Sequence, residues 1–283
     1  MRQFEWPMVS SGEVAVISGE VIVMLVLLGA FVGVAAGLFG IGGGGIFVPA
    51  LSALFLNLGF PTEEIMHMAL GTSMATIIAT STASAWAHHK RGGVIWPSWR
   101  AMTPGVFVGT FLATFLVAQL NAHALAVFFA LFMSLVAWQM WFPLRVQSSS
   151  EPGRLELATA GGVIGAISAL VSIGGGSLTV PYLHWRNHKL TDAIGTSAAL
   201  GLPIAITGSL GYLVNGWQHT QLASGQLGFI YLPAVVVLTV ASVLTAPLGV
   251  RLAHWLPVPI LKKLFGLLIV VISVRMIWQV WQA

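Results

Sequence analysis

The stretch GLFGIGGGGIFVPAL, from Gly37 to Leu51, places four consecutive glycines inside an apolar run, and the fold of the chain follows from it. Each glycine inside a helix costs roughly 1 kcal/mol relative to alanine, but glycine also allows a positive φ and a close approach of the backbone. The run therefore predicts an interrupted helix. The interruption is either a functional backbone site or a purely structural break.

The composition is that of an integral membrane protein. Of 283 residues, 57% are hydrophobic and only 7% are charged, whereas soluble domains are about 25% charged. Several apolar stretches approach the ~20 residues that a membrane-spanning helix needs, and the alternating polarity of a membrane β-barrel is absent. We therefore predict an all-α integral membrane fold that crosses the bilayer many times. The predicted apolar segments are 21–40, 46–58, 66–87, 101–120, 123–144, 155–172, 177–185, 193–214, 229–250 and 258–281.

Charge and cysteine content narrow the expected partners. The net charge is +4, and there is no cysteine for a disulfide or a thiolate metal site. Because the basic residues occupy short loops between apolar segments, positive-inside topology explains them better than nucleic-acid binding does. The polar segment 1–20 lacks the basic start of a signal peptide. The expected partners are the lipid bilayer and a small anion, without nucleic acid or cofactor, and an oligomer is also compatible with the sequence.

The chain contains an internal repeat. At an offset of 132 residues, GIGGGGIFVP (Gly40–Pro49) aligns with SIGGGSLTVP (Ser172–Pro181). At an offset of 124, ALGTSM (Ala69–Met74) aligns with AIGTSA (Ala193–Ala198). At an offset of 136, LAVFFAL from Leu125 shares its leucine and phenylalanine spacing with LKKLFGL from Leu261. Two copies of one unit therefore account for nearly the whole chain.

The charges of equivalent loops predict that the two copies are inverted. The loop near 57–65 has Glu63 and Glu64, but its counterpart near 184–192 has Arg186 and Lys189. Two further pairs of loops switch in the same way, so equivalent loops lie on opposite sides if basic loops stay cytoplasmic. Each copy is then a glycine-broken re-entrant hairpin plus three transmembrane helices, as in secondary transporters. The predicted organisation is a polar segment 1–20, a first repeat 21–144, a cytoplasmic linker 145–154 and a second repeat 155–283.

The two glycine tips are the predicted substrate site. A reversal inside the bilayer leaves N–H groups unpaired at the start of the next helix, where the helix dipole favours an anion. Discontinuous helices at corresponding places in two repeats are typical of transporter sites. The predicted ligands are Gly42, Gly43, Gly44 and Gly45 from the first repeat, and Gly174, Gly175, Gly176 and Ser177 from the second.

The GlyThrSer motifs of both repeats are further candidate ligands. Their hydroxyl groups, on Thr72, Ser73, Thr196 and Ser197, are able to donate hydrogen bonds to an oxyanion. The alternative is that these hydroxyls bond to carbonyl groups of their own helix, as is common in membrane helices.

Other glycines and the histidines are interpreted as structural. Gly29, Gly33 and Gly37 have the four-residue spacing of close helix packing. His67 and the loop histidines lie mostly near predicted helix ends, where we expect interfacial positions.

The positions of the acids exclude several other functions. All eight Asp and Glu residues fall outside the centres of predicted helices. The sequence therefore predicts no metal site, no cation carrier and no carboxylate proton relay. A serine nucleophile on a GlyXaaSerXaaGly turn is also absent, so the chain is not expected to be an enzyme.

These motifs resemble those of the TauE/SafE sulfite exporter family of bacterial inner-membrane proteins. The resemblance rests on GLFGIGGGGIFVP, ALGTSM, HHKRGGV, SIGGGSLTVP, AIGTSA and LKKLFGLL, and it covers nearly the whole chain. It implies a secondary transporter that exports sulfite or small organosulfonates such as sulfoacetate across the bacterial inner membrane. Two alternatives stay open, a passive anion channel and a transporter of another small carboxylated anion. One departure is Ser177, which stands where the first copy has Gly45.

Overall fold

The computed structural model describes residues 18–39, 43–141, 152–222 and 225–253, together with a few single positions between 266 and 274. Most of the predicted polar segment 1–20, most of the linker 145–154 and most of the segment 258–281 lie outside these ranges. The helices are α1 (Gly19–Phe39), α2 (Gly44–Asn57), α3 (Thr62–His89), α4 (Trp96–Gln119), α5 (Ala122–Trp141), α6 (Arg154–Val171), α7 (Gly176–Trp185), α8 (Leu190–Asn215), the 3₁₀ turn η1 (Trp217–His219) and α9 (Leu232–Ala253).

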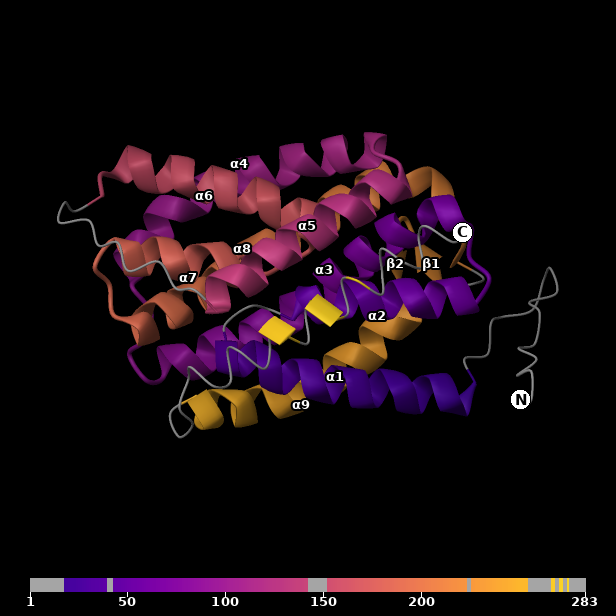
Figure 1. The fold of residues 1–283 in the computed structure, drawn as a ribbon, viewed down its shortest axis with the longest axis horizontal. Helices are drawn as coiled ribbons and strands as arrows, with labels where there is room; N and C mark the ends of the chain where they lie inside the picture. The colour runs from indigo at the N-terminus through magenta and orange to yellow at the C-terminus, as the bar shows by residue number, and fades with distance from the viewer. Residues whose placement is uncertain are drawn as a thin grey trace.

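The long helices lie side by side along the long axis of the molecule (Figure 1). Six of the described helices, α1, α4, α5, α6, α8 and α9, are long and apolar enough to cross a membrane. Large apolar side chains such as Leu27, Leu131 and Leu244 are exposed on their outer faces, whereas many serine and threonine side chains are buried. This distribution agrees with a multi-pass membrane protein that has lipid around it and buried hydroxyl groups within a largely apolar core.

Both glycine runs end one helix and begin a short one. Gly43 precedes α2 with a φ of 88°, and Gly175 precedes α7 with a φ of 78°, both in the left-handed region that glycine adopts without strain. A Cβ atom on Gly43 would meet Val32 of α1, and one on Gly175 would meet Ile164 of α6. Each short helix therefore begins about two turns before the end of the helix that precedes it.

Glycines also permit two tightly packed helix pairs, α1 with α9 and α4 with α6. A Cβ atom on Gly29 would lie 2.9 Å from the carbonyl oxygen of Leu238, and one on Gly37 would overlap that of Ala246. The predicted packing role of these glycines is confirmed. Gly105 and Gly109 make the same kind of contact with Ala158 and Gly162. In both pairs the two helices run parallel, because contact positions increase together along the two helices.

Helices α3 and α8 form the antiparallel centre of the bundle. The contacts of Gly195 with His88, of Gly201 with Ser81 and of Gly208 with Met74 set their register. On one side α3 packs against α2 and α9, and on the other side α8 packs against α7 and α4. The two short helices therefore flank a central pair.

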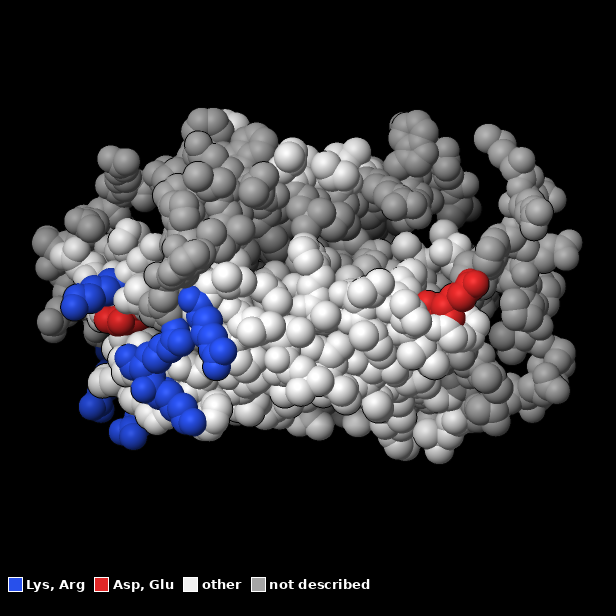
Figure 2. Space-filling view, turned by 90° about the horizontal axis from the view of Figure 1, so that it is seen from below, with Lys and Arg blue, Asp and Glu red and all other residues white. Residues whose placement is uncertain are grey.

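The two ends of the bundle differ in charge. Figure 2 shows Lys and Arg gathered at one end, which we call the basic end. Arg91 donates to the carbonyl of Val250 at 3.2 Å, and Arg186 pairs with Glu156 at the same end. The opposite end, which we call the acidic end, contains Glu63 and Glu64 in the first turn of α3. All described Lys and Arg residues belong to the basic end: Lys90, Arg91, Arg100, Arg154, Arg186, Lys189 and Arg251.

A small β-hairpin adds a short stretch of strand to the predicted all-α fold. Strands β1 (Gln226–Leu227) and β2 (Ile230–Tyr231) pair antiparallel between η1 and α9. Their two-residue turn begins at Gly228, whose φ of 58° suits a tight hairpin. The predicted apolar segment 229–250 therefore begins in the hairpin and becomes helical at Leu232. The described part of the fold is nearly all helical.

Candidate functional site

The two glycine tips lie against one another near the central helices. A Cβ atom on Gly44 would overlap the carbonyl oxygen of Ser172, so only glycine fits at this contact. The Ser172 hydroxyl donates to the carbonyl of Leu70 on α3 at 2.9 Å. On the other side, a Cβ atom on Gly201 of α8 would lie 3.0 Å from the Gly174 carbonyl. The structure thus brings the second tip between α3 and α8, with the start of α2 beside it.

The start of each short helix presents N–H groups that no carbonyl of the same helix can accept. At α7 the Gly175 carbonyl accepts from the N–H groups of Leu178 and Thr179. Gly176 and Ser177 are the first two residues of α7, so their N–H groups have no carbonyl one turn earlier in that helix. At α2 the Gly43 carbonyl likewise accepts from Ile46 and Phe47. Such N–H groups carry the partial positive charge of a helix N-terminus.

Buried hydroxyl groups without a protein partner occur in the same region. In the part of the chain that the structure describes, this holds for Ser177 and Thr179 in the first turns of α7, and for Ser73 of α3. Each of the three residues is at most 7% exposed. An unpaired buried polar group is costly, so these hydroxyls are available for a ligand.

The threonines of the GlyThrSer motifs are engaged differently. The Thr72 Oγ1 accepts a hydrogen bond from the N–H of Tyr231 at 2.9 Å, and the Thr196 Oγ1 accepts one from the N–H of Ile95 at 2.8 Å. Thr196 also donates to the Asp192 carbonyl at 2.7 Å. In this conformation the Thr196 hydroxyl therefore has no proton left for an anion.

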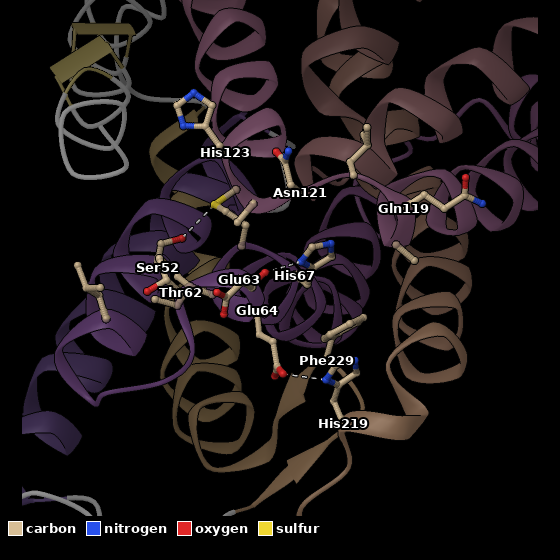
Figure 3. A pocket seen from close by; sticks show the side chains of 16 residues that line it. Ser52, Thr62, Glu63, Glu64, His67, Gln119, Asn121, His123, His219 and Phe229 are labelled. Carbon is tan, nitrogen blue, oxygen red and sulfur yellow. Dashed lines mark hydrogen bonds and ion pairs between the residues drawn. The ribbon is translucent and has the colours of Figure 1, made fainter. Parts of the chain in front are cut away.

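A cavity of about 720 Å³ opens at the acidic end, between the start of α3, the α4–α5 connection and the hairpin segment (Figure 3). His67 forms part of its wall and is only 7% exposed. Its Nδ1 lies 3.3 Å from the Glu63 carbonyl and its Nε2 lies 3.1 Å from the Val117 carbonyl. The remaining polar lining residues are Ser52, Thr62, Glu63, Glu64, Gln119, Asn121, His123 and His219.

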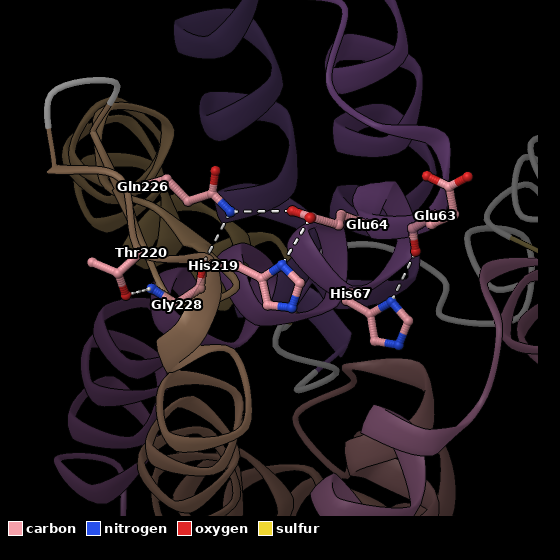
Figure 4. A network of polar contacts seen from close by, with 7 residues as sticks. All are labelled: Glu63, Glu64, His67, His219, Thr220, Gln226 and Gly228. Atoms are coloured by element: carbon pink, nitrogen blue, oxygen red, sulfur yellow. Dashed lines mark hydrogen bonds and ion pairs between the residues drawn. The ribbon is translucent and has the colours of Figure 1, made fainter.

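Phe229 links this cavity to α3. Its ring lies between the imidazoles of His67 and His219, with centroid separations of 5.0 and 5.1 Å. The Nδ1 of His219 is 2.8 Å from Glu64 Oε1, and Gln226 approaches the other oxygen of Glu64 at 3.5 Å (Figure 4). Three separate segments, η1, the hairpin and the start of α3, are joined by these contacts.

Comparison with known proteins identifies the family. Residues 25–276 match the family model described as "Sulfite exporter TauE/SafE". The chain belongs to the TauE/SafE family. A "Probable membrane transporter protein" of Haemophilus influenzae is 36% identical over 90% of this chain and 97% of its own length. A "Probable membrane transporter protein MJ0441" of Methanocaldococcus jannaschii is 25% identical, over 81% of this chain and 85% of its own length. No solved structure gives a significant match to the chain.

Only some of the residues predicted to bind the anion in this TauE/SafE protein are placed together by the structure. Gly43, Gly44, Gly174 and Gly175 belong to the tips as expected, whereas Gly42 lies outside the described residues. In the same described ranges no three His, Asp or Glu residues are placed to hold a metal ion. That the tips and the serines bind an anion stays a prediction.

Sequence reasoning missed the cavity at the acidic end. His67 and His88 were expected at the interface but are buried. No local signal pointed to the stack of His67, Phe229 and His219, because its members come from segments about 150 residues apart.

Proposed function

We propose that this TauE/SafE protein is a secondary transporter that exports a small sulfur oxyanion, sulfite or an organosulfonate such as sulfoacetate, across the bacterial inner membrane. The observation that carries the proposal is the contact of Gly44 at the start of α2 with Ser172 at the end of α6, beside the start of α7. The first N–H groups of α2 and α7 have no acceptor within their own helices. Unpaired N–H groups are tolerated inside a membrane protein only where they face a cavity or a ligand. The anion would be held between the start of α2 and the start of α7.

The chemistry of the donors favours an oxyanion. Around the tips there are N–H groups of Gly176 and Ser177 and buried hydroxyls of Ser73 and Ser177, but the described acids lie at the ends of the bundle. Several donors without a neighbouring carboxylate suit a compact anion with several oxygens. The membrane potential drives an anion outward, so export needs no coupling ion in principle.

We further propose that the two halves are inverted repeats. Equivalent helices run in opposite directions between the two ends: α3 runs from the acidic to the basic end, and α8 runs back. α1 of the first half packs against α9 of the second half, and the equivalent helix α6 of the second half packs against α4 of the first half. Both short helices return toward the end at which the preceding helix began, as a re-entrant hairpin would. Such an arrangement permits alternating access around a site on the repeat axis.

A binding panel tests this function. Purified protein is melted with sulfite, sulfoacetate, sulfate, acetate and chloride, each over a concentration series. A specific ligand at one hundred times its Kd adds about 2.7 kcal/mol to stability, so sulfite or sulfoacetate should raise Tm in a saturable manner while chloride should not. Equal effects of all five anions would contradict the proposal.

Flux measurements separate a carrier from a channel. In proteoliposomes loaded with unlabelled sulfite, a carrier should accelerate uptake of labelled sulfite, because both use the same alternating site. Uptake that neither saturates nor responds to the internal substrate would identify a passive anion channel. Uptake that saturates with acetate but not with sulfite would identify a carboxylated anion as the substrate.

A further inference from the structure

Two loops of the bundle are held in the same way by the GlyThrSer motifs. The loop Gly92–Ile95, which we call the basic-end loop, precedes α4, and the loop Gly228–Tyr231, which we call the acidic-end loop, precedes α9. Ile95 donates its N–H to Thr196, and Tyr231 donates its N–H to Thr72. These loops lie at opposite ends of the protein.

The glycine of each motif makes the approach possible. A Cβ atom on Gly195 would overlap the carbonyl oxygen of Gly93, and one on Gly71 would overlap that of Phe229. In each case the glycine receives a loop carbonyl and the next residue, threonine, receives the N–H two positions further along the loop. The same two-part contact is therefore built twice, from GlyThrSer motifs that the internal repeat makes equivalent.

The acidic-end loop lies between the cavity and the glycine tips. The Phe229 ring faces the cavity between His67 and His219, while its carbonyl rests on Gly71. Leu70, the residue before Gly71, accepts the hydrogen bond from Ser172 at the second tip. One turn of α3 thus separates the wall of the cavity from the candidate anion site, and the loop covers that turn.

We propose that Thr72 and Thr196 are positioning residues that hold these two loops closed, one at each end of the transport route. This proposal rests on the transport function proposed above. Each closure depends on one hydrogen bond to a hydroxyl, which is weak enough to break and form again in a transport cycle. Release of the Thr72 contact opens the site toward the acidic-end cavity, and release of the Thr196 contact opens it toward the basic end.

The Thr196 contacts argue against a ligand role for this threonine. The Thr196 Oγ1 already donates to the Asp192 carbonyl and accepts from the Ile95 N–H. An anion would have to compete for a proton that the helix uses. Thr196 consequently differs from Ser73 and Ser177, whose hydroxyls have no protein partner among the described residues.

Sided thiol labelling tests the proposal in the full chain, which has no native cysteine. Ser81→Cys serves as the reporter, because Ser81 is 2% exposed and contacts Gly201 beside the second tip. Thr72→Val should increase the labelling rate from the acidic-end side about two- to ten-fold, the factor expected for loss of one hydrogen bond. Thr196→Val should produce that increase from the basic-end side only.

Matched variants keep the result interpretable. Thr76→Val removes a hydroxyl that donates to the carbonyl of Thr72 in its own helix, and it should leave both rates unchanged. Thr72→Ser and Thr196→Ser restore the hydroxyl and should return the rates to those of the Ser81→Cys parent. Equal rates in all variants, or an increase from the same side for both valine variants, would overturn the proposal.

The sulfite titration separates this proposal from the transport proposal. If the labelling rates change as expected but sulfite does not raise Tm, the proposed role of the threonines in loop closure stands and the proposal of sulfite as substrate is rejected. If the labelling rates do not change but the valine variants bind sulfite more weakly, loop closure by the threonines is rejected and the threonines are ligands of the anion. If a valine variant does not fold, Thr72→Ala or Thr196→Ala, which also lacks the hydroxyl, takes its place and must raise the labelling rate from the same side.

Discussion

The backbone of Gly44 lies against the carbonyl oxygen of Ser172 so closely that no side chain fits between them. One residue begins the short helix of the first half, and the other ends the long helix of the second half. A ligand bound at this contact touches both halves at once. Any relative movement of the halves therefore changes the contact, which is the property that an alternating-access site needs.

Replacement of Gly175 by alanine should reduce transport more than it reduces stability. The φ of 78° costs an L-residue about 1–2 kcal/mol, and the added Cβ would lie 2.7 Å from the Ile204 side chain. Gly59→Ala is the matched control, because Gly59 has a φ of 76° with open space around it. Both variants should lower Tm, but only Gly175→Ala should lower the sulfite flux. Equal flux in the two variants would reduce Gly175 to a structural turn.

Removal of the Ser177 hydroxyl should weaken anion binding without a loss of stability. This hydroxyl has no protein partner in the described chain, so Ser177→Ala breaks no internal hydrogen bond. A hydrogen bond to a charged ligand contributes about 1.5–3 kcal/mol, which corresponds to about ten-fold or more in Kd. Ser242→Ala is the control, since Ser242 is buried and donates to the Leu238 carbonyl at 2.6 Å. If Ser177→Ala binds sulfite like the parent, the serine is not a ligand.

Single cysteines at the two ends should be labelled from opposite sides of the membrane. Lys90 lies in the basic-end connection and Gln218 lies in η1 at the acidic end, and both are exposed. Lys90→Cys should react with an impermeant reagent only from the cytoplasmic side, because basic loops stay inside. Gln218→Cys and Asn121→Cys should react only from outside. Reaction of Lys90→Cys and Gln218→Cys from one side would refute the inverted arrangement.

A larger residue at Gly249 should destabilise the helix pair that it belongs to. A Cβ atom there would overlap the carbonyl oxygen of Val34 on α1, so Gly249→Val forces α1 and α9 apart. Overpacking of this kind costs about 1–3 kcal/mol, visible as a lower Tm in detergent. Gly19→Val at the start of α1 has nothing within 4 Å of its Cβ and should change Tm much less.

The repeat of the glycine run allowed much of the fold to be predicted from sequence. α2 begins at Gly44 and α7 begins at Gly176, at the offset of 132 residues that the two glycine motifs share. The N–H groups at the tips were predictable because the run must end a helix. The hairpin was not, because its strands are two residues long and adjoin an apolar helix.

The hydrogen bonds of the two motif threonines could not be predicted from local sequence. A threonine in an apolar helix is expected either to bond to its own helix or to face a ligand. Thr72 instead receives an N–H from Tyr231, 159 residues away. Only the three-dimensional register of α3 against the start of α9 decides between these outcomes, and that register depends on packing across the whole bundle.

The pairing of α1 with α9 constrains the order in which helix contacts form during synthesis. α1 precedes the other described helices in the chain, yet the helix that its glycine face packs against lies near the end of the described chain. α4 and α6 are separated in the chain by α5 alone, so their contact is able to form earlier. Until α9 has been synthesised, the face of α1 with Gly29, Gly33 and Gly37 lacks the helix that it packs against in the folded protein. A chain truncated before α9 is therefore expected to lose this helix pair while it keeps the pair of α4 and α6.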